Sequence, residues 1–325
     1  MHVAHPYETL TPDRILQALE AWGWACDGRL LALNSYENRV YQAGIEDGEP
    51  VIVKFYRPER WSDEAILEEH AFAHELAQQE VPVVAPLTDE RGNSLMRHGE
   101  FRFAVFPRRG GRWPDLDTRE QRQHMGRFLG RLHAVASVHD FEHRPRLDIE
   151  RLGECSRQTI LQGRFLPDYL RDAYDSLTRE LLDTVRERFE AAAPQGEIRL
   201  HGDCHKGNIL WRDTGPHFVD LDDAITGPPI QDLWMLLDGD RENMRRQLDQ
   251  LLEGYILFRD FDPGSTTLIE PLRTLRILHH SAWIARRWDD PAFPAAFPWF
   301  AAPRYWEEHI LSLREQQSAL QEPPL

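Results

Sequence analysis

The sequence predicts an α+β protein with two lobes, a small N-terminal lobe (residues 1–107) built on an antiparallel sheet and a larger, mainly helical C-terminal lobe (residues 108–325). Three observations support this prediction. Short β-branched and aromatic runs separated by polar turns fill the chain up to Pro107, and helical periodicity dominates beyond it. The length of 325 residues is also enough for about two domains.

The N-terminal lobe is expected to begin with a helix and to continue as strands interrupted by a second helix. Thr11 is a suitable N-cap for the first helix because its hydroxyl can accept a backbone N–H. Ser62, followed by two acids, starts the second helix, which runs to about Gln79. The expected strands cover residues 29–36, 38–43, 50–56, 94–97 and 101–106.

The C-terminal lobe combines long amphipathic helices with one short β-like region. Thr118 and Gln121 have the spacing of a capping box, and Pro167 is suited to the first turn of another helix. The β-like runs cover residues 198–200, 209–212 and 217–221. This order predicts a helical lobe that presents a small β region at one place.

Composition and charge exclude several classes of function. The chain has 38 Lys and Arg against 54 Asp and Glu, a net charge of −16, whereas binding to a phosphate backbone needs a basic field. No apolar run approaches the ~20 residues of a membrane span, and no secretory signal is visible. Three separated cysteines cannot form a disulfide framework. We therefore expect a cytoplasmic monomer that binds neither nucleic acid nor membrane.

The segment from His201 to Asn208 carries the strongest chemical signal. Asp203 and Asn208 are five residues apart, and Asp220 follows an apolar run 17 residues after Asp203. Phosphoryl transfer needs one carboxylate that orients the attacking hydroxyl and accepts its proton. It also needs a second carboxylate and an amide oxygen to hold Mg²⁺ across the phosphates. Kinase-like folds present these groups in this order along the chain.

Two other interpretations of this segment stay open at the level of sequence. Asp and Asn also form turns and caps in ordinary polar loops. His201, Cys204 and His205 could bind zinc, although neither a His-Glu-x-x-His helix nor a second cysteine pair completes the coordination.

Lys54 lies inside a β-branched strand, where a charged side chain is otherwise unfavourable. A lysine at a sheet edge or surface is the ordinary alternative. A helix with Glu68 and Glu69 follows about 15 residues later, and a helix carboxylate can aim such a lysine at phosphates. Glu69 is preferred because it shares an inward helical face with Phe72, Ala73 and Leu76, whereas Glu68 lies ~100° away.

The segment 33–40 is where a nucleotide-covering loop is expected, yet it has no glycine. Backbone N–H groups and the Ser35 hydroxyl could still contact phosphate, and a plain hairpin turn is the alternative. The pattern G-x-x-x-x-G-K-[ST] does not occur, so a P-loop fold is excluded.

Together these motifs resemble the aminoglycoside phosphotransferase and choline kinase superfamily of protein-kinase-like folds, with Asp222 in place of the glycine of D-F-G. A closer similarity, to bacterial cytoplasmic serine/threonine protein kinases, extends over nearly the whole chain. It is carried by the runs 33–41, 53–61, 200–212, 218–223, 231–237 and 291–299.

The resemblance implies a bilobal fold with a nucleotide-binding N-terminal lobe and a catalytic, substrate-binding C-terminal lobe. Asp203 would be the proton acceptor, and Asn208 and Asp220 would be Mg²⁺ ligands. The residues expected to bind ATP are Ser35 (also a candidate autophosphorylation site), Lys54, Glu69, and Phe106 and Arg108 at the hinge between the lobes. The expected cofactors are ATP and Mg²⁺.

The resulting prediction is an ATP-dependent serine/threonine protein kinase that acts in a stress response. One alternative keeps the mechanism and changes the acceptor to a small molecule such as an aminoglycoside, because the acidic segment 220–223 would suit a polycation. Another is a pseudokinase that binds ATP without transferring phosphate, which the full set of expected catalytic groups disfavours. Asp232 could brace the catalytic loop or cap a helix.

Overall fold

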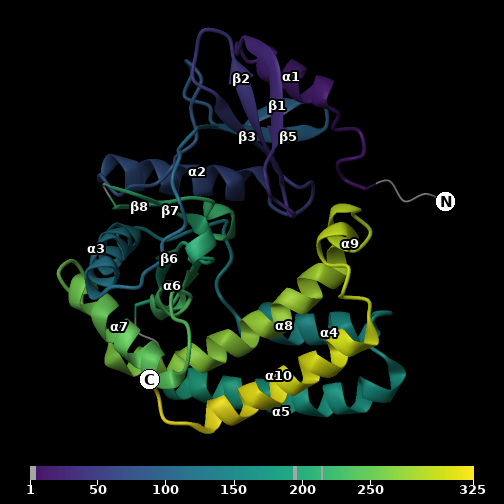
Figure 1. Ribbon diagram of the computed structural model, residues 1–325, viewed down its shortest axis with the longest axis vertical. Helices are drawn as coiled ribbons and strands as arrows, with labels where there is room; N and C mark the ends of the chain where they lie inside the picture. The colour runs from purple at the N-terminus through teal and green to yellow at the C-terminus, as the bar shows by residue number, and fades with distance from the viewer. Residues whose placement is uncertain (1–4, 193–195, 214) are drawn as a thin grey trace.

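The computed structural model describes residues 5–192, 196–213 and 215–325 and has two lobes, one above the other in Figure 1. The upper, N-terminal lobe comprises α1 (Pro12–Glu20), β1 (Cys26–Ala32), β2 (Arg39–Ile45), β3 (Val51–Phe55), α2 (Asp63–Gln78), β4 (Met96–His98) and β5 (Phe101–Pro107). Its strands form one antiparallel sheet in the order β1-β2-β3-β5-β4. The predicted α+β bilobal class is confirmed.

The two faces of this sheet have different partners. One face is apolar, and its residues Val53 and Phe55 share a buried core with Ile15 and Leu19 of α1. Side chains alternate along a strand, so Lys54 lies on the opposite face. This alternation places one buried cation on the side of the sheet away from α1.

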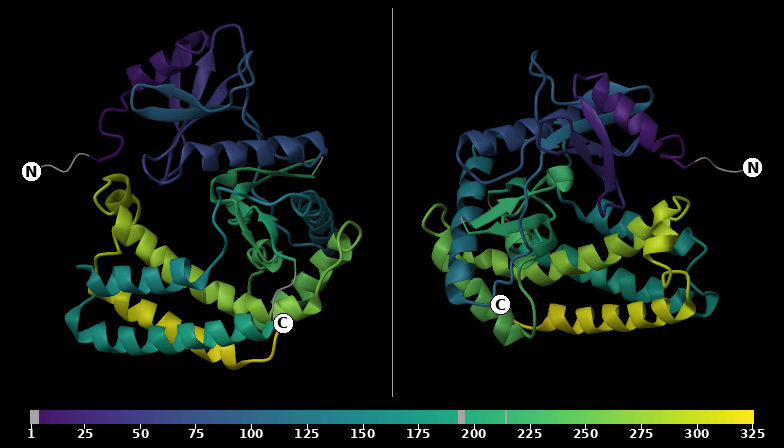
Figure 2. Two further views of the ribbon diagram at one scale, coloured as in Figure 1. Left: turned by 180° about the vertical axis from the view of Figure 1, so that it is seen from behind. Right: turned by 45° about the horizontal axis from the view of Figure 1, so that its top comes forward.

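Helix α2 lies between the sheet and the C-terminal lobe (Figure 2). The Ser62 hydroxyl accepts a hydrogen bond from the backbone N–H of Ala65, and two acids occupy the first turn. Phe72 and Leu76 of α2 belong to the large apolar core of the C-terminal lobe. The helix therefore packs against both lobes and carries Glu69 at their junction.

The C-terminal lobe is mainly helical, and no described helix has the length and apolar character needed to cross a bilayer. It comprises α3 (Arg119–Ala136), α4 (Cys155–Gln162), α5 (Arg171–Ala192), α6 (Ile230–Trp234), α7 (Arg241–Tyr255), α8 (Ile269–Arg287), α9 (Ala292–Ala296) and α10 (Pro303–Gln321). The capping box of Thr118 and Gln121 is present at the start of α3. Pro167 precedes a short 3₁₀ turn that leads into α5.

Helices α3 and α7 approach each other closely at glycines. A Cβ atom on Gly126 of α3 would lie 1.9 Å from the carbonyl oxygen of Leu251 on α7, and one on Gly254 of α7 would lie 2.0 Å from that of Gln123. The two backbones are therefore in direct contact, which only glycine allows. This contact fixes α3, whose His133 supports the loop described below.

Two small antiparallel pairs lie beneath α2. Strand β6 (Ile198–Leu200) pairs with β9 (Ile225–Gly227), and β7 (Ile209–Arg212) pairs with β8 (Gly215–Phe218). The loops 201–208 and 219–224 join these pairs, and the Val219 N–H donates to the Asn208 carbonyl at 3.0 Å. The pairing therefore brings the two polar loops side by side, and β9 was not expected from the sequence.

Some strand boundaries differ from the prediction. The strand expected over residues 29–36 ends at Ala32, because the loop 33–38 leaves the sheet and bonds to the C-terminal lobe. The strand expected over 217–221 ends at Phe218, and Asp220 adopts a left-handed conformation with φ 60°. A non-glycine residue is strained in this region, which is common at functional loops. The lobe boundary at residue 107 stays a prediction.

Candidate active site

The side chain of Lys54 lies at the centre of a cluster of carboxylates. Its Nζ is 2.9 Å from Asp220 Oδ1, 3.1 Å from Asp222 Oδ1 and 3.6 Å from Glu69 Oε1. Burial favours the neutral amine, but the three carboxylates outweigh it and hold the Lys54 pKa well above its usual value. The fold thus brings β3, α2 and the loop after β8 to one buried ammonium group.

Glu69, rather than Glu68, is the helix carboxylate beside Lys54. Its side chain is buried, and burial raises its pKa to about 7, although the Lys54 ammonium acts in the opposite direction. The Arg144 guanidinium lies 3.9 Å from its other oxygen. Glu68 instead accepts hydrogen bonds from three successive backbone N–H groups at residues 142–144.

Asp222 is a further acid of the cluster. In the sequence it stands out as a departure from D-F-G and as part of the acidic segment 220–223, but it was not predicted as a site residue. It is 2% exposed, and it accepts hydrogen bonds from the Arg60 guanidinium and, at 3.0 Å, from Asn38 Nδ2. Burial raises its pKa, but Arg60 and Lys54 outweigh burial and hold that pKa below the usual value. A buried carboxylate therefore stays ionised between two cations.

Asp203 lies in the loop after β6, with 22% of its side chain exposed. One carboxylate oxygen is 2.7 Å from Arg276 Nη1 of α8, and the other is 3.4 Å from His205 Nε2. Burial raises the Asp203 pKa, but the His205 and Arg276 hydrogen bonds outweigh it and hold the pKa below its usual value. The carboxylate is therefore ionised at neutral pH, as a proton acceptor must be.

The loop that carries Asp203 is braced from below by Asp232 of α6. The two Asp232 oxygens accept the backbone N–H groups of His201 and Gly202, each at 2.9 Å, and His133 Nε2 lies 3.1 Å from one of them. His201 Nε2 in turn lies 3.0 Å from the Val219 carbonyl oxygen. Of the two roles considered for Asp232, the structure shows the brace.

Oxygen donors suited to a divalent cation lie at Asn208 and Asp220. Asn208 uses its amide Nδ2 to donate to Asp203, which leaves the amide oxygen for a ligand. Asp220 accepts Lys54 through Oδ1, and its side chain is 51% exposed. Two such donors fit Mg²⁺, which keeps several waters and takes its remaining ligands from substrate phosphates.

The zinc interpretation of His201, Cys204 and His205 finds no support in the geometry. The His201 ring is bonded to a backbone carbonyl, and the Cys204 side chain is fully buried, which raises the thiol pKa well above its usual value. Within residues 5–192, 196–213 and 215–325, no cluster of three or more His, Cys, Asp or Glu side chains could hold a metal ion.

Two of the other predicted nucleotide residues lie at the Lys54 face of the sheet, and the third lies in the loop after β1. Phe106 pairs with Ile52 of β3, two residues before Lys54, so both side chains project from the Lys54 face. Arg108 Nε donates to Gln42 Oε1 at 2.9 Å. Ser35 lies in the loop 33–38 and donates to the Asn38 carbonyl at 3.2 Å.

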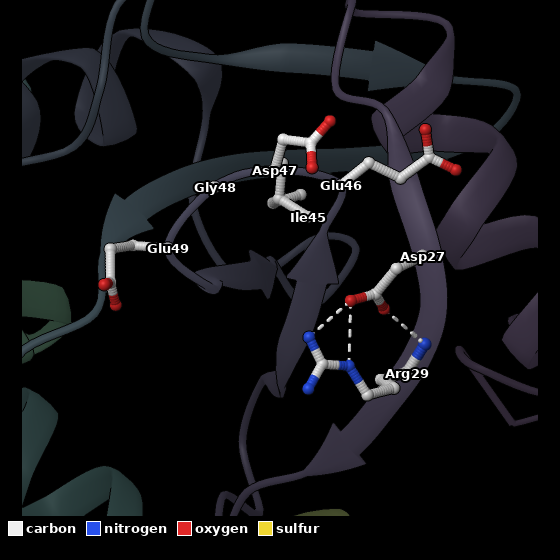
Figure 3. A pocket seen from close by; sticks show the side chains of 7 residues that line it. All are labelled: Asp27, Arg29, Ile45, Glu46, Asp47, Gly48 and Glu49. Atoms are coloured by element: carbon white, nitrogen blue, oxygen red, sulfur yellow. Dashed lines mark hydrogen bonds and ion pairs between the residues drawn. The ribbon is translucent and has the colours of Figure 1, made fainter.

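A surface hollow of about 690 Å³ lies elsewhere, at the turn between β2 and β3 (Figure 3). It is lined by Asp27, Arg29 and the segment 45–49, and Asp27 is paired with Arg29. None of the predicted site residues lines it, so this hollow is separate from the Lys54 cluster.

This chain belongs to the phosphotransferase enzyme family (APH), whose family model matches residues 29–268. That span contains every site residue predicted from the sequence. Within the family, the chain is 47% identical over 326 residues to stress response kinase A of Escherichia coli K12, covering 99% of this chain and 97% of the relative. It is 46% identical over 322 residues to the serine/threonine protein kinase RdoA of Salmonella typhimurium LT2, with the same coverage. The resemblance found in the sequence is confirmed.

Solved structures of the same fold are more distant in sequence. An amicoumacin kinase in complex with AMP-PNP and Ca²⁺ superposes with a TM-score of 0.73 at 18% identity, covering 94% of this chain and 95% of that one. Spectinomycin phosphotransferase in complex with ADP and spectinomycin has a TM-score of 0.68 at 15% identity, with coverages of 94% and 98%. These similarities establish the phosphotransferase fold.

Proposed function

We propose that this chain transfers the γ-phosphoryl group of ATP to serine or threonine hydroxyls of protein substrates. The observation that carries the proposal is the convergence of Lys54 with Asp220, beside a loop that holds Asp203 and Asn208. The relatives named stress response kinase A and serine/threonine protein kinase RdoA support a protein acceptor. A role in a stress response rests on the same names.

Each charged group of the site has a part in this reaction. Lys54, held by Glu69 and Asp222, would neutralise the phosphate oxygens of ATP. Asn208 and Asp220 would hold Mg²⁺, which would screen the charge on the phosphates. Asp203 would align the acceptor hydroxyl and take up its proton late, as the bond to the leaving ADP breaks.

The sheet face beside Lys54 would bind the rest of the nucleotide. Phe106 offers an apolar surface for adenine next to the hinge, and Arg108 lies at its edge, bonded to Gln42. Ser35 lies in the loop that would cover the phosphates, which makes it a candidate for autophosphorylation.

A small-molecule acceptor is the second candidate, because the solved relatives of this fold include an amicoumacin kinase and a spectinomycin phosphotransferase. The acidic segment 220–223 was expected to suit a polycationic acceptor. In the structure, Lys54 pairs with Asp220, and Arg60 pairs with both Asp222 and Asp223. Each of these acids is already paired with a cation of the chain, which weighs against a polycationic acceptor.

The test is incubation of the purified protein with γ-labelled ATP and Mg²⁺, followed by mass spectrometry of the protein and of added acceptors. We expect phosphate on serine or threonine of protein substrates, and far slower labelling by the Asp203→Asn variant. Fast labelling of one metabolite with no label on any protein would replace the protein acceptor by a small molecule. Tight nucleotide binding without transfer under any metal would leave only a pseudokinase. Cytoplasmic location and a monomeric state stay predictions.

A further inference from the structure

The loop 33–38, which joins β1 to β2 and has no glycine, is bonded to the C-terminal lobe. Figure 1 shows this loop descending from the sheet toward α9. Glu37 in this loop is buried, with 9% of the residue exposed, and its carboxylate is 3.0 Å from Arg287 Nε of α8. The Trp283 indole N–H, one helical turn earlier on α8, donates to the same carboxylate. Tyr36 packs its ring 5.2 Å from that of Phe297.

A buried acid of the C-terminal lobe completes these contacts from the other side. Asp290, between α8 and α9, is 3% exposed as a residue. One of its oxygens is 2.7 Å from Arg39 Nη2, and the other is 2.5 Å from Arg57 Nη2. Arg39 begins β2 and Arg57 follows β3, so the Asp290 carboxylate binds an arginine at one end of each of these two neighbouring strands.

The two arginines pass this support on to the loop backbone. Arg39 Nη1 donates to the Tyr36 carbonyl at 3.0 Å, and Arg57 Nε donates to the Glu37 carbonyl at 2.9 Å. Carbonyl groups of the loop are thus fixed by guanidinium groups that Asp290 itself orients. We call Glu37, Arg39, Arg57, Trp283, Arg287 and Asp290 the interlobe network.

The interlobe network continues into the Lys54 cluster through Asn38. Its side-chain oxygen accepts the Arg57 backbone N–H at 3.0 Å, and its Nδ2 donates to Asp222 at 3.0 Å. Asp222 in turn holds Lys54. The interlobe network therefore contacts the loop 33–38 directly and contacts Lys54 through Asn38 and Asp222.

We propose that Asp290 is a positioning residue that holds the loop 33–38, through Arg39 and Arg57, in the conformation that receives the nucleotide phosphates. This rests on the proposed function, in which the cleft binds ATP. A glycine-rich loop closes when the nucleotide arrives, whereas this loop is held closed by buried ion pairs before binding. A loop that is already ordered lowers the entropy cost of nucleotide binding. Removing the Asp290 charge takes from Arg39 its carboxylate partner and leaves the buried Arg57 paired with Glu37 alone, so the loop should open.

The experiment compares Asp290→Asn with the wild type and with Asp289→Asn. Asp289 is the matched control, because it is the preceding residue but its side chain is 80% exposed and pairs with Arg164 at 3.2 Å. Hydrogen exchange of the peptide covering residues 33–38 is measured without nucleotide, and AMP-PNP affinity is measured by calorimetry in the presence of Mg²⁺.

We expect the loop amides of Asp290→Asn to exchange about tenfold faster or more without nucleotide, and AMP-PNP affinity to fall by a similar factor. The KM for ATP should rise much more than kcat falls, and Asp290→Glu should recover part of the loss. Asp289→Asn should match the wild type in every measurement.

Unchanged exchange of the loop in Asp290→Asn, or unchanged AMP-PNP affinity, would overturn the proposal. If Asp290→Asn does not fold, Arg39→Gln replaces it. This variant removes the ion pair of Asp290 with Arg39 and leaves the pair with Arg57. Loop exchange and AMP-PNP affinity should then change in the same direction by smaller factors, and no change in either would overturn the proposal. Failure of the proposed function has a different signature in the wild type itself: either it does not bind AMP-PNP, or it binds AMP-PNP but transfers no phosphate to protein. In both cases the exchange measurement without nucleotide still tests the loop.

Discussion

Arg276 of α8 forms an ion pair with Asp203, with 2.7 Å between guanidinium nitrogen and carboxylate oxygen across 73 positions of sequence. The acceptor hydroxyl would need the same carboxylate. Arg276 therefore borders the place where the acceptor would bind, and together with His205 it lowers the Asp203 pKa against the effect of burial.

Replacing Asp203 by asparagine should lower the rate of phosphoryl transfer by on the order of 10²–10⁴-fold, because the amide cannot accept the hydroxyl proton. Nucleotide affinity should stay close to that of the wild type, because Asp203 would act on the acceptor. Initial rates of ADP formation and AMP-PNP calorimetry check the two parts. Asp249→Asn, on an exposed position of α7, is the control. A wild-type rate of transfer in Asp203→Asn would show that Asp203 is not the proton acceptor.

Replacing Arg276 by glutamine should move the acid limb of the pH–rate profile to higher pH. Burial raises the Asp203 pKa while Arg276 and His205 lower it, so removal of one of these two lets the pKa rise toward its ordinary value. The profile of kcat/KM between pH 4 and pH 8 measures the shift. Arg273→Gln is the matched control, since Arg273 lies on the same helix and pairs with Glu270. An acid limb that stays in place would contradict the assigned role of the ion pair.

Replacing Asp220 by asparagine should weaken nucleotide binding mainly when Mg²⁺ is present, because one of the two oxygen donors loses its charge. We expect the Mg²⁺-dependent gain in AMP-PNP affinity to fall by about tenfold or more. Calorimetric titrations with Mg²⁺ and with EDTA separate this effect from a general loss of affinity. A gain from Mg²⁺ equal to that of the wild type would exclude Asp220 as a ligand.

The buried carboxyl of Glu69 should make stability depend on pH in a defined direction. Its pKa is raised from 4.5 to about 7, so between these values the unfolded chain has released a proton that the folded protein retains. The unfolded state binds fewer protons, and the stability contributed by Glu69 is lost as the pH rises through this window. Relative to the wild type, Glu69→Gln should therefore gain stability from pH 4.5 to pH 7.

Urea unfolding at several pH values measures this difference, with Glu187→Gln on an exposed position of α5 as the control. A free-energy difference between Glu69→Gln and the wild type that does not change with pH would show that Glu69 is ionised throughout.

Replacing Gly126 by alanine should destabilise the protein by at least about 1–3 kcal/mol, because the new methyl group would meet the Leu251 carbonyl oxygen. Gly110→Ala is the matched control, since nothing lies within 4 Å of a Cβ atom at that position. Thermal or urea unfolding compares the two variants. Equal stability of both would mean that α3 and α7 can separate without cost.

Much of the fold could be predicted because its signals act over a few residues. The caps at Thr11, Ser62 and Thr118 fixed three helix starts, since a side-chain oxygen and the N–H groups it accepts lie within one turn. The helical period placed Glu69, rather than Glu68, on the inward face. The end of β1 was wrong because the loop that follows it is held by the other lobe, which no local pattern encodes.

The charged partners were missed for a related reason. Arg276 stands in a helix segment whose charges are typical of a solvated face, and no local pattern marked Arg60 or Asp290. A weak signal was present, however. The runs 33–41 and 53–61, which carry the family resemblance, contain Glu37, Arg39 and Arg57, and the run 291–299 begins directly after Asp290. Two of these resembling segments thus supply members of the interlobe network, and the third begins directly beside it.

By itself, the sequence determined the two-lobed class, the helix starts and the family, and it singled out the residues proposed to react, because these depend on residue type and short spacing. Only the tertiary structure decided which charges neutralise one another: Arg60 with Asp222, Arg276 with Asp203, and Arg39 and Arg57 with Asp290. The energy of an ion pair depends on the distance and burial of two groups, and neither is set until the lobes have packed.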